Sequence, residues 1–236
     1  GEILGVRLAF ILALAFALLA LVLQQVFVED RKTAGKAERN PLKLFGGMSP
    51  AFRKLLIADI LVRFSEQIPY AFMAIWVINN NGLSPVTFGL LTTIEMITAM
   101  LVYIPIAYLA DRGSKKPFVV TTFAFFTLFP LILMFSHKIW MFVLAFIIRG
   151  LKEFGEPTRK ALIMDLASEG QKAAMFGLYY LLRDVIVSIA AFSAGFLWNL
   201  SPKVNFLTAF SFGLVGTVYF AVFGQDVVIQ KKEQII

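Results

Sequence analysis

Residues 118–136 read FVVTTFAFFTLFPLILMFS, an apolar stretch without a charged side chain. About twenty consecutive apolar residues are what a helix needs to cross the hydrocarbon core of a bilayer. No water is present there to bond the backbone, so a spanning segment must be a helix or part of a closed barrel. Because the apolar residues run on without period-two alternation, we predict a membrane-spanning helix.

The composition of the whole chain extends this prediction. Of its 236 residues 59% are hydrophobic, against about 45–50% in a typical soluble domain. Comparable stretches recur, and we predict seven spans, at about 4–28, 55–78, 85–110, 118–136, 139–166, 174–198 and 205–224. The expected fold class is therefore all-α, a polytopic transmembrane helical bundle.

The predicted spans divide into one helix followed by six. The first apolar run, 8–28, is too long for the hydrophobic region of a signal peptide and ends in Gln24-Gln25 and charged residues, so we interpret 1–28 as a true transmembrane segment. Residues 29–54 are polar and rich in Gly and Pro, which predicts a linker with an interfacial stretch at 42–45. The six helices of 55–224 and a tail, 225–236, follow.

The net charge of +7 is carried mainly by the loops between spans. This placement argues against a nucleic-acid partner and instead predicts orientation, since Lys and Arg concentrate in cytoplasmic loops. If the linker is cytoplasmic, that side holds Arg31, Lys32, Lys36, Arg39, Lys43, Arg53, Lys54, Arg112, Lys115, Lys116, Lys172, Lys231 and Lys232, and the other side only Arg7, Lys138 and Lys203. We expect a multi-pass protein of the cell membrane with its N-terminus outside and its C-terminus cytoplasmic.

An internal repeat is visible within the six helices. The triplet Phe-Gly-Leu occurs at 88–90 and again at 176–178, and the same offset pairs Pro69 with Pro157. By the predicted topology the two copies, about 55–136 and 139–224, run in opposite directions across the membrane. Such a 3+3 inverted repeat is typical of transporter halves.

Ionisable residues inside the predicted spans point to a functional site. Each costs roughly 2.5–3.5 kcal/mol at a helix centre on insertion scales, so it needs a partner or a polar cavity. In span 55–78, Asp59, Arg63 and Glu66 are spaced i+4 and i+3 and share one face, next to Pro69. We expect these three to be neighbours and Pro69 to kink the helix.

A second set of charges lies in the later spans. Arg149, Lys152, Glu153 and Glu156 are spaced along one predicted stripe before Pro157, and Glu95, Arg183 and Asp184 complete the set. We expect Arg159 and Lys160, nearer the boundary, to reach towards the headgroups. The set has six acids against four bases, which motivates a proton-coupling hypothesis with Glu66 and Glu95 as candidates. Pairing that merely fixes helix packing is the alternative for each charge.

The loop between two of the spans resembles a family signature. Residues 107–117 read AYLADRGSKKP, which is similar to the major facilitator superfamily loop G-x-L-A-D-R-x-G-R-K, with Ala107 and the pair Lys115-Lys116 as departures. Arg149-Gly150 with Gly155 and Pro157 is similar, more loosely, to the arginine- and glycine-bearing helix that begins each second triplet. The resemblance implies a gating loop made of Asp111, Arg112, Gly113, Lys115 and Lys116.

The same resemblance implies a secondary active transporter that moves a small solute by alternating access. The six close helices would be its C-terminal half and residues 4–28 the last helix of its N-terminal half, so about five further helices are expected before this chain. The implied partners are a small-molecule substrate, protons, the lipid bilayer and the missing N-terminal half.

A seven-helix membrane receptor is the main alternative, because the helix count and the outside N-terminus fit it too. An enzyme is not expected, since the sequence lacks H-E-x-x-H and G-x-S-x-G motifs. With no cysteine and one histidine, His137, the sequence predicts neither a metal site nor a cofactor.

Overall fold

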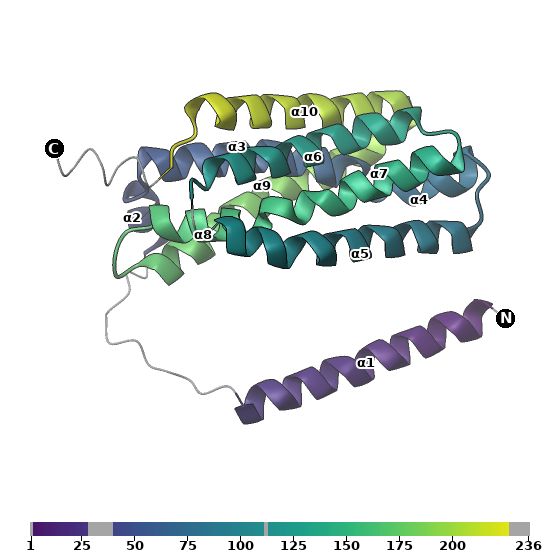
Figure 1. The fold of residues 1–236 in the computed structure, drawn as a ribbon, viewed down its shortest axis with the longest axis horizontal. Coiled ribbons are helices and arrows are strands. Elements are labelled where there is room, and N and C mark those ends of the chain that lie inside the picture. Colours follow the sequence, from purple (N-terminus) through teal and green to yellow (C-terminus); the bar gives the residue numbers. More distant parts are fainter. Residues whose placement is uncertain (1, 28–39, 111–112, 227–236) are drawn as a thin grey trace. The chain divides into compact units, whose positions relative to one another are not determined.

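The computed structural model describes residues 2–27, 40–110 and 113–226, and all regular elements in these ranges are helical (Figure 1). The chain divides into two compact units, residues 1–36 and 37–236. The first contains α1 (Glu2–Phe27), a single helix whose Leu4–Phe27 stretch is long and apolar enough to cross a membrane.

The second unit is a helical bundle. Its elements are α2 (Pro41–Gly46), α3 (Pro50–Tyr70), α4 (Met73–Ile75), the π-helical turn η1 (Trp76–Asn80), α5 (Pro85–Ala110), α6 (Lys116–Phe135), α7 (Ile139–Leu151), the 3₁₀ turn η2 (Lys152–Gly155), α8 (Glu156–Leu166), α9 (Lys172–Leu200) and α10 (Pro202–Phe223).

The helix predicted at 55–78 begins five residues earlier and is interrupted. Ser49 caps α3 by accepting a hydrogen bond from the amide of Phe52 at 3.2 Å, and Pro50 occupies the first helical position, where its missing N–H costs nothing. The last residues of the predicted linker are therefore helical. Near the other end, α3 stops one residue after Pro69, because proline removes a backbone donor and crowds the preceding turn. The chain then continues through α4 and η1.

The helix predicted at 139–166 is also broken. The 3₁₀ turn η2 separates α7 from α8, and the amide of Gly155 donates a hydrogen bond to the hydroxyl of Thr122 on α6 instead of continuing the α-helix. Pro157 lies in the first turn of α8, where an unsatisfied amide is expected in any case. The break changes the direction of the side chains on either side of it.

Five helices in the described ranges are long and apolar enough to cross a membrane. They are Leu4–Phe27, Pro85–Tyr103, Lys116–Phe135, Lys172–Leu200 and Pro202–Phe223. The two remaining predicted spans, 55–78 and 139–166, are the segments with charges and breaks. That these two segments cross the membrane stays a prediction. Their apolar residues alone do not offset their charges, which need partners on other helices.

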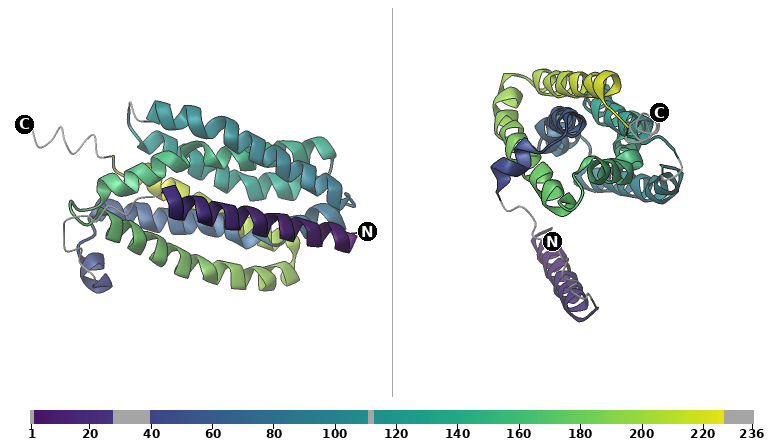
Figure 2. Two further views of the ribbon diagram at one scale, coloured as in Figure 1. Left: turned by 90° about the horizontal axis from the view of Figure 1, so that it is seen from below. Right: turned by 90° about the vertical axis from the view of Figure 1, so that its left-hand side faces the viewer.

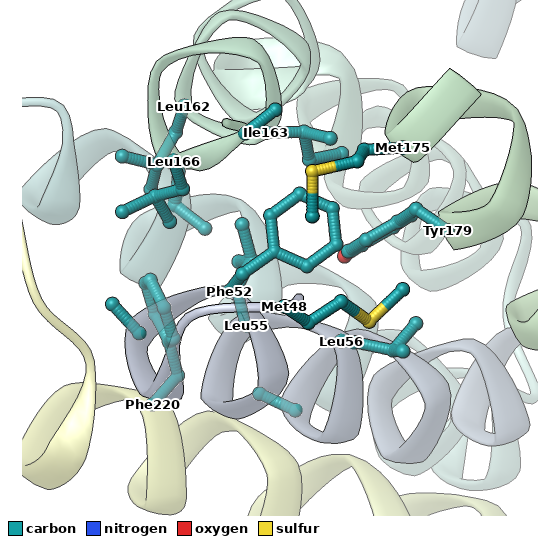
Figure 3. Close-up of a cluster of buried hydrophobic side chains, with 14 of the residues drawn as sticks. Met48, Phe52, Leu55, Leu56, Leu162, Ile163, Leu166, Met175, Tyr179 and Phe220 are labelled. Carbon is teal, nitrogen blue, oxygen red and sulfur yellow. The ribbon is translucent and has the colours of Figure 1, made fainter. Parts of the chain in front are cut away.

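Helix α3 lies in the middle of the bundle, with α6, α9 and α10 against it (Figure 2). One apolar cluster packs Phe52 and Leu55 of α3 against Leu162 of α8 and Tyr179 of α9 (Figure 3), with the rings of Phe52 and Tyr179 edge to face at 5.4 Å. A second cluster gathers Trp76, Phe129, Leu133, Phe142, Phe146 and Phe206. Along the chain, Arg63 and Glu66 lie between the last α3 residue of the first cluster, Val62, and the first residue of the second, Met73.

Small residues set the contact between α10 and α3. A Cβ atom on Gly213 would lie 2.7 Å from the hydroxyl oxygens of both Ser65 and Thr127, and one on Gly216 would lie 2.9 Å from the carbonyl oxygen of Ala58. Helices in membranes associate through such close packing, since lipid is as apolar as the helix surface. Both glycines therefore allow an approach that alanine would prevent.

We expect Gly213→Ala to destabilise the bundle by about 1–3 kcal/mol, the usual cost of overpacking. The matched control is Gly195→Ala on α9, because a Cβ atom there has nothing within 4 Å and alanine favours a helix over glycine by about 0.8–1 kcal/mol. Reversible unfolding in mixed detergent micelles, followed by circular dichroism, measures both. Equal stability of the two variants would contradict the packing described here.

Candidate functional site

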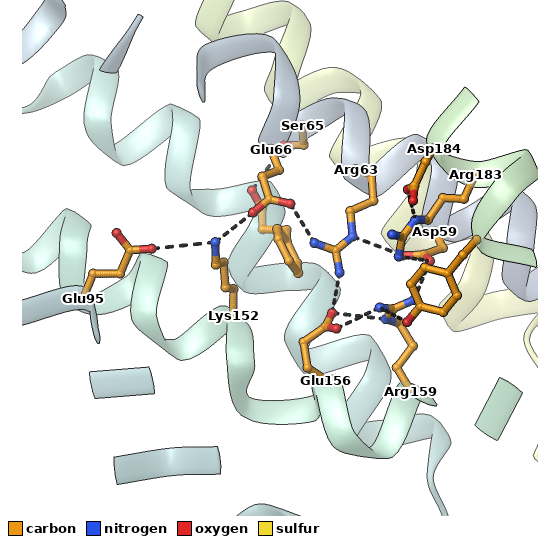
Figure 4. Close-up of polar contacts among 12 residues, drawn as sticks. Asp59, Arg63, Ser65, Glu66, Glu95, Lys152, Glu156, Arg159, Arg183 and Asp184 are labelled. Carbon is orange, nitrogen blue, oxygen red and sulfur yellow. Dashed lines mark hydrogen bonds and ion pairs between the residues drawn. The ribbon is translucent and has the colours of Figure 1, made fainter. Parts of the chain in front are cut away.

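Asp59, Arg63 and Glu66 of α3 are neighbours, as their spacing predicts (Figure 4). Nη1 of Arg63 lies 2.7 Å from Oε2 of Glu66, and Nε of Arg63 lies 3.6 Å from Oδ1 of Asp59. Arg63 also lies over the ring of Phe126, 4.6 Å from its centre. A guanidinium between two carboxylates, on the face of an aromatic ring, is well placed to balance buried charge.

The charges of the second predicted stripe do not stay on one face. Because η2 interrupts the helix, Lys152 reaches Glu66 at 2.7 Å while Glu156 accepts a hydrogen bond from Arg63 at 2.6 Å. Arg149 pairs with Glu95 of α5, and Nζ of Lys152 lies 3.7 Å from the same carboxylate. Glu95, which has no partner on its own helix, is thus held by two bases from the α7–η2 segment.

Arg159 is a site residue that sequence reasoning missed. The prediction that it reaches the headgroups is wrong, since its side chain is only 1% exposed, whereas Lys160 is exposed. Its guanidinium lies 2.5 Å from Asp59 and 2.7 Å from Glu156. The i,i+3 spacing from Glu156 was the signal available in the sequence; the pair with Asp59, 100 residues away, had none.

Helix α9 closes the site on one side. The hydroxyl of Tyr179 donates to Asp59 at 2.9 Å, and Arg183 lies 3.6 Å from the same carboxylate while stacking over the ring of Tyr180. Nε of Arg183 also donates to Asp184 at 2.7 Å, although the Asp184 side chain is 60% exposed. Arg183 therefore joins α9 to the charges of α3.

These contacts join into one ion-pair network across four segments of the bundle. Its acids are Asp59, Glu66, Glu95, Glu156 and Asp184, and its bases are Arg63, Arg149, Lys152, Arg159 and Arg183. Acids and bases are equal in number, so the formal charges of the network sum to zero when all ten groups are ionised. Counting six acids against four bases overlooked Arg159; once it is added, the excess is a single acid.

That acid is Glu153, the second residue of η2. Its side chain is partly exposed, and within ranges 40–110 and 113–226 no base forms an ion pair with it. Together with Lys152 and residues of α5 it lines a cavity of about 380 Å³. Of the residues predicted for the site, Glu153 is the one that the structure leaves outside the network.

The predicted gating loop is only partly described. Asp111 and Arg112 lie outside the described residues, and Gly113 is exposed. Lys115 forms an ion pair with Asp165 of α8. Oδ2 of the buried Asp226 accepts hydrogen bonds from the hydroxyl of Ser114 at 2.7 Å and from the amide of Lys116 at 2.9 Å. The start of α6 is thereby tied to the segment that follows α10.

Comparison with known protein families supports the resemblance seen in the loop. The Major Facilitator Superfamily profile matches residues 55–234, a range that holds the whole network and the loop. A comparison with curated proteins found no match. The match and the helical structure confirm the predicted all-α transmembrane bundle. The chain therefore belongs to the major facilitator superfamily, a family of membrane transporters.

Proposed function

We propose that this chain supplies the C-terminal half of a secondary active transporter, which moves a small solute by alternating access and couples this movement to protons. Residues 4–28 would end an N-terminal half that completes the transporter. The termini would lie as the loop charges predict, with the N-terminus outside and the 113–117 loop cytoplasmic. A receptor function is disfavoured by the family match.

The ion-pair network is the observation that carries this proposal. Charges in membrane helices are costly and typically mark substrate, ion or proton pathways. Here they connect α3, α5, α9 and the broken α7–η2–α8 segment. A change in any one ion pair therefore alters the contacts between these elements. Packed interfaces of this kind switch between discrete arrangements rather than deforming continuously.

Glu153 is the acid best suited to accept the coupling proton. Glu66 and Glu95 remain candidates, but each carboxylate contacts two bases, and protonating it would disrupt both pairs. Protonation of Glu153 breaks no ion pair among the described residues. Lys152, Glu95 and Glu156 lie around it, so its charge influences the network without being part of it.

Cysteine accessibility tests the proposal without knowledge of the substrate. The chain contains no cysteine, so single cysteines at Gly89 on α5 and at Met164 on α8 report on the two ends of the bundle. In membranes holding the full-length protein, we expect acidic and alkaline buffers to change the two maleimide labelling rates in opposite directions. Alternating access requires this opposition, because opening one side closes the other.

Glu153→Gln, which mimics the protonated acid, is expected to make both labelling rates independent of pH. The matched control is Glu169→Gln, in the exposed loop before α9, and it should keep the response of the parent protein. Labelling rates that move together or stay constant in the parent protein contradict alternating access. A response that survives Glu153→Gln but is lost in Glu66→Gln or Glu95→Gln assigns the proton to the network instead.

A further inference from the structure

The cavity beside Glu153 has the size and walls of a small-molecule site. Its volume of about 380 Å³ lies within the range of roughly 300–1,000 Å³ that ligand pockets occupy. It is lined by Glu95, Met96, Ala99, Met100 and Tyr103 of α5 and by Lys152 and Glu153 of η2. Apart from Glu95 the α5 wall is therefore apolar, whereas the η2 wall carries the charges of Lys152 and Glu153.

The charges of this cavity do not cancel at short range. Lys152 contacts both Glu66 and Glu95, and Glu95 in turn holds Arg149, so these side chains compensate each other within the network. Glu153 has no such partner in the described part of the chain. A carboxylate at the edge of a low-dielectric region attracts a positive charge more strongly than one in water does. The cavity thus presents one uncompensated negative charge.

The apolar wall narrows the choice of cation. Met96 and Met100 are 55% and 73% exposed, and their flexible, polarisable thioethers adapt to ligands of irregular shape. Tyr103 adds an aromatic ring, on which an organic cation can rest. A small hydrated metal ion needs several oxygen ligands, whereas this wall offers sulfur, methyl and aromatic groups. A sugar would need many polar partners that the wall does not supply.

We propose that this cavity binds a hydrophobic organic monocation, with Glu153 as its counter-ion and the methionines and Tyr103 around its apolar body. The inference rests on the proposed transport function and names its substrate class. The proton proposed for Glu153 and this cation would then compete for the same carboxylate.

Equilibrium dialysis of the detergent-solubilised full-length protein tests the inference, with tetraphenylphosphonium as the probe. Tetraphenylborate, of the same shape but opposite charge, is the matched ligand control. We expect the parent protein to bind the cation and not the anion. Glu153→Gln should weaken cation binding by about tenfold or more, which is the loss of one productive charge contact. Glu153→Asp should restore part of it, and Glu169→Gln should leave it unchanged.

Three results would overturn the inference: no binding of the cation by the parent protein, equal binding of cation and anion, or unchanged affinity in Glu153→Gln. Failure here is distinguishable from failure of the proposed function. Opposite pH responses of the Gly89 and Met164 cysteines without cation binding would leave the transporter intact and remove only the substrate class. Cation binding without those pH responses would keep the binding site and contradict alternating access.

Discussion

Replacing Arg159 with leucine should lower the free energy of unfolding by about 3–5 kcal/mol, the cost of breaking a buried ion pair by removing one partner. Its guanidinium is 1% exposed and lies between Asp59 and Glu156. Without it, Asp59 loses its closest base and Glu156 keeps only Arg63. Since folded proteins are typically stable by about 5–15 kcal/mol, this single change should be visible as a strong loss of folded protein.

The matched control is Lys160→Leu, one position further along α8. Lys160 is exposed and forms no ion pair in the part of the chain that the structure describes, so its replacement should change stability by no more than about 0.5 kcal/mol. Reversible unfolding in mixed detergent micelles measures the two variants. Equal stability of the two variants would contradict the buried position of Arg159 between Asp59 and Glu156.

Replacing Arg149 with leucine should also cost about 3–5 kcal/mol, because it leaves the buried Glu95 with Lys152 alone, at 3.7 Å. The guanidinium of Arg149 lies 5.7 Å from the ring centre of Tyr70 and 5.5 Å from that of Phe129, so leucine can occupy this apolar space. The double variant Glu95→Leu/Arg149→Leu removes both charges, and a buried pair replaced by apolar residues is often neutral or stabilising.

We therefore expect the double variant to regain most of the stability that Arg149→Leu loses. The same unfolding measurement on the two single variants and the double variant gives the coupling free energy of the pair. Additive losses would contradict the contact between Arg149 and Glu95. If the double variant regains stability but its cysteine labelling no longer depends on pH, the pair acts in the conformational change and not only in folding.

The network explains how a bundle of this polarity keeps its helices together. Asp59, Arg63 and Glu66 each have an ion-pair partner on another element. The apolar cluster of Phe52 packs against α3, and the cluster of Trp76 gathers the segments that follow it. The breaks at Pro69 and at η2 lie beside the charges. Backbone irregularity and buried charge thus occur together, in a part of the bundle where protein surrounds the non-helical backbone.

The sequence by itself determined the helical class, the approximate helix positions and the pairing within α3. These follow from local physics, since apolar length specifies a membrane helix and spacing specifies which side chains share a face. It also pointed to the family through a loop whose residues are contiguous. The start of α3 was placed too late, because the capping by Ser49 lies outside the apolar stretch.

Only the tertiary structure decided which charges meet and which one is left over. Arg63 and Glu156 are 93 residues apart, and Tyr179 and Asp59 are 120 apart, so no spacing rule connects them. The 3₁₀ turn η2 turned Lys152 and Glu156 towards different partners and left Glu153 facing the cavity. Ion pairs act over a few ångströms, and those distances exist only once the helices have packed.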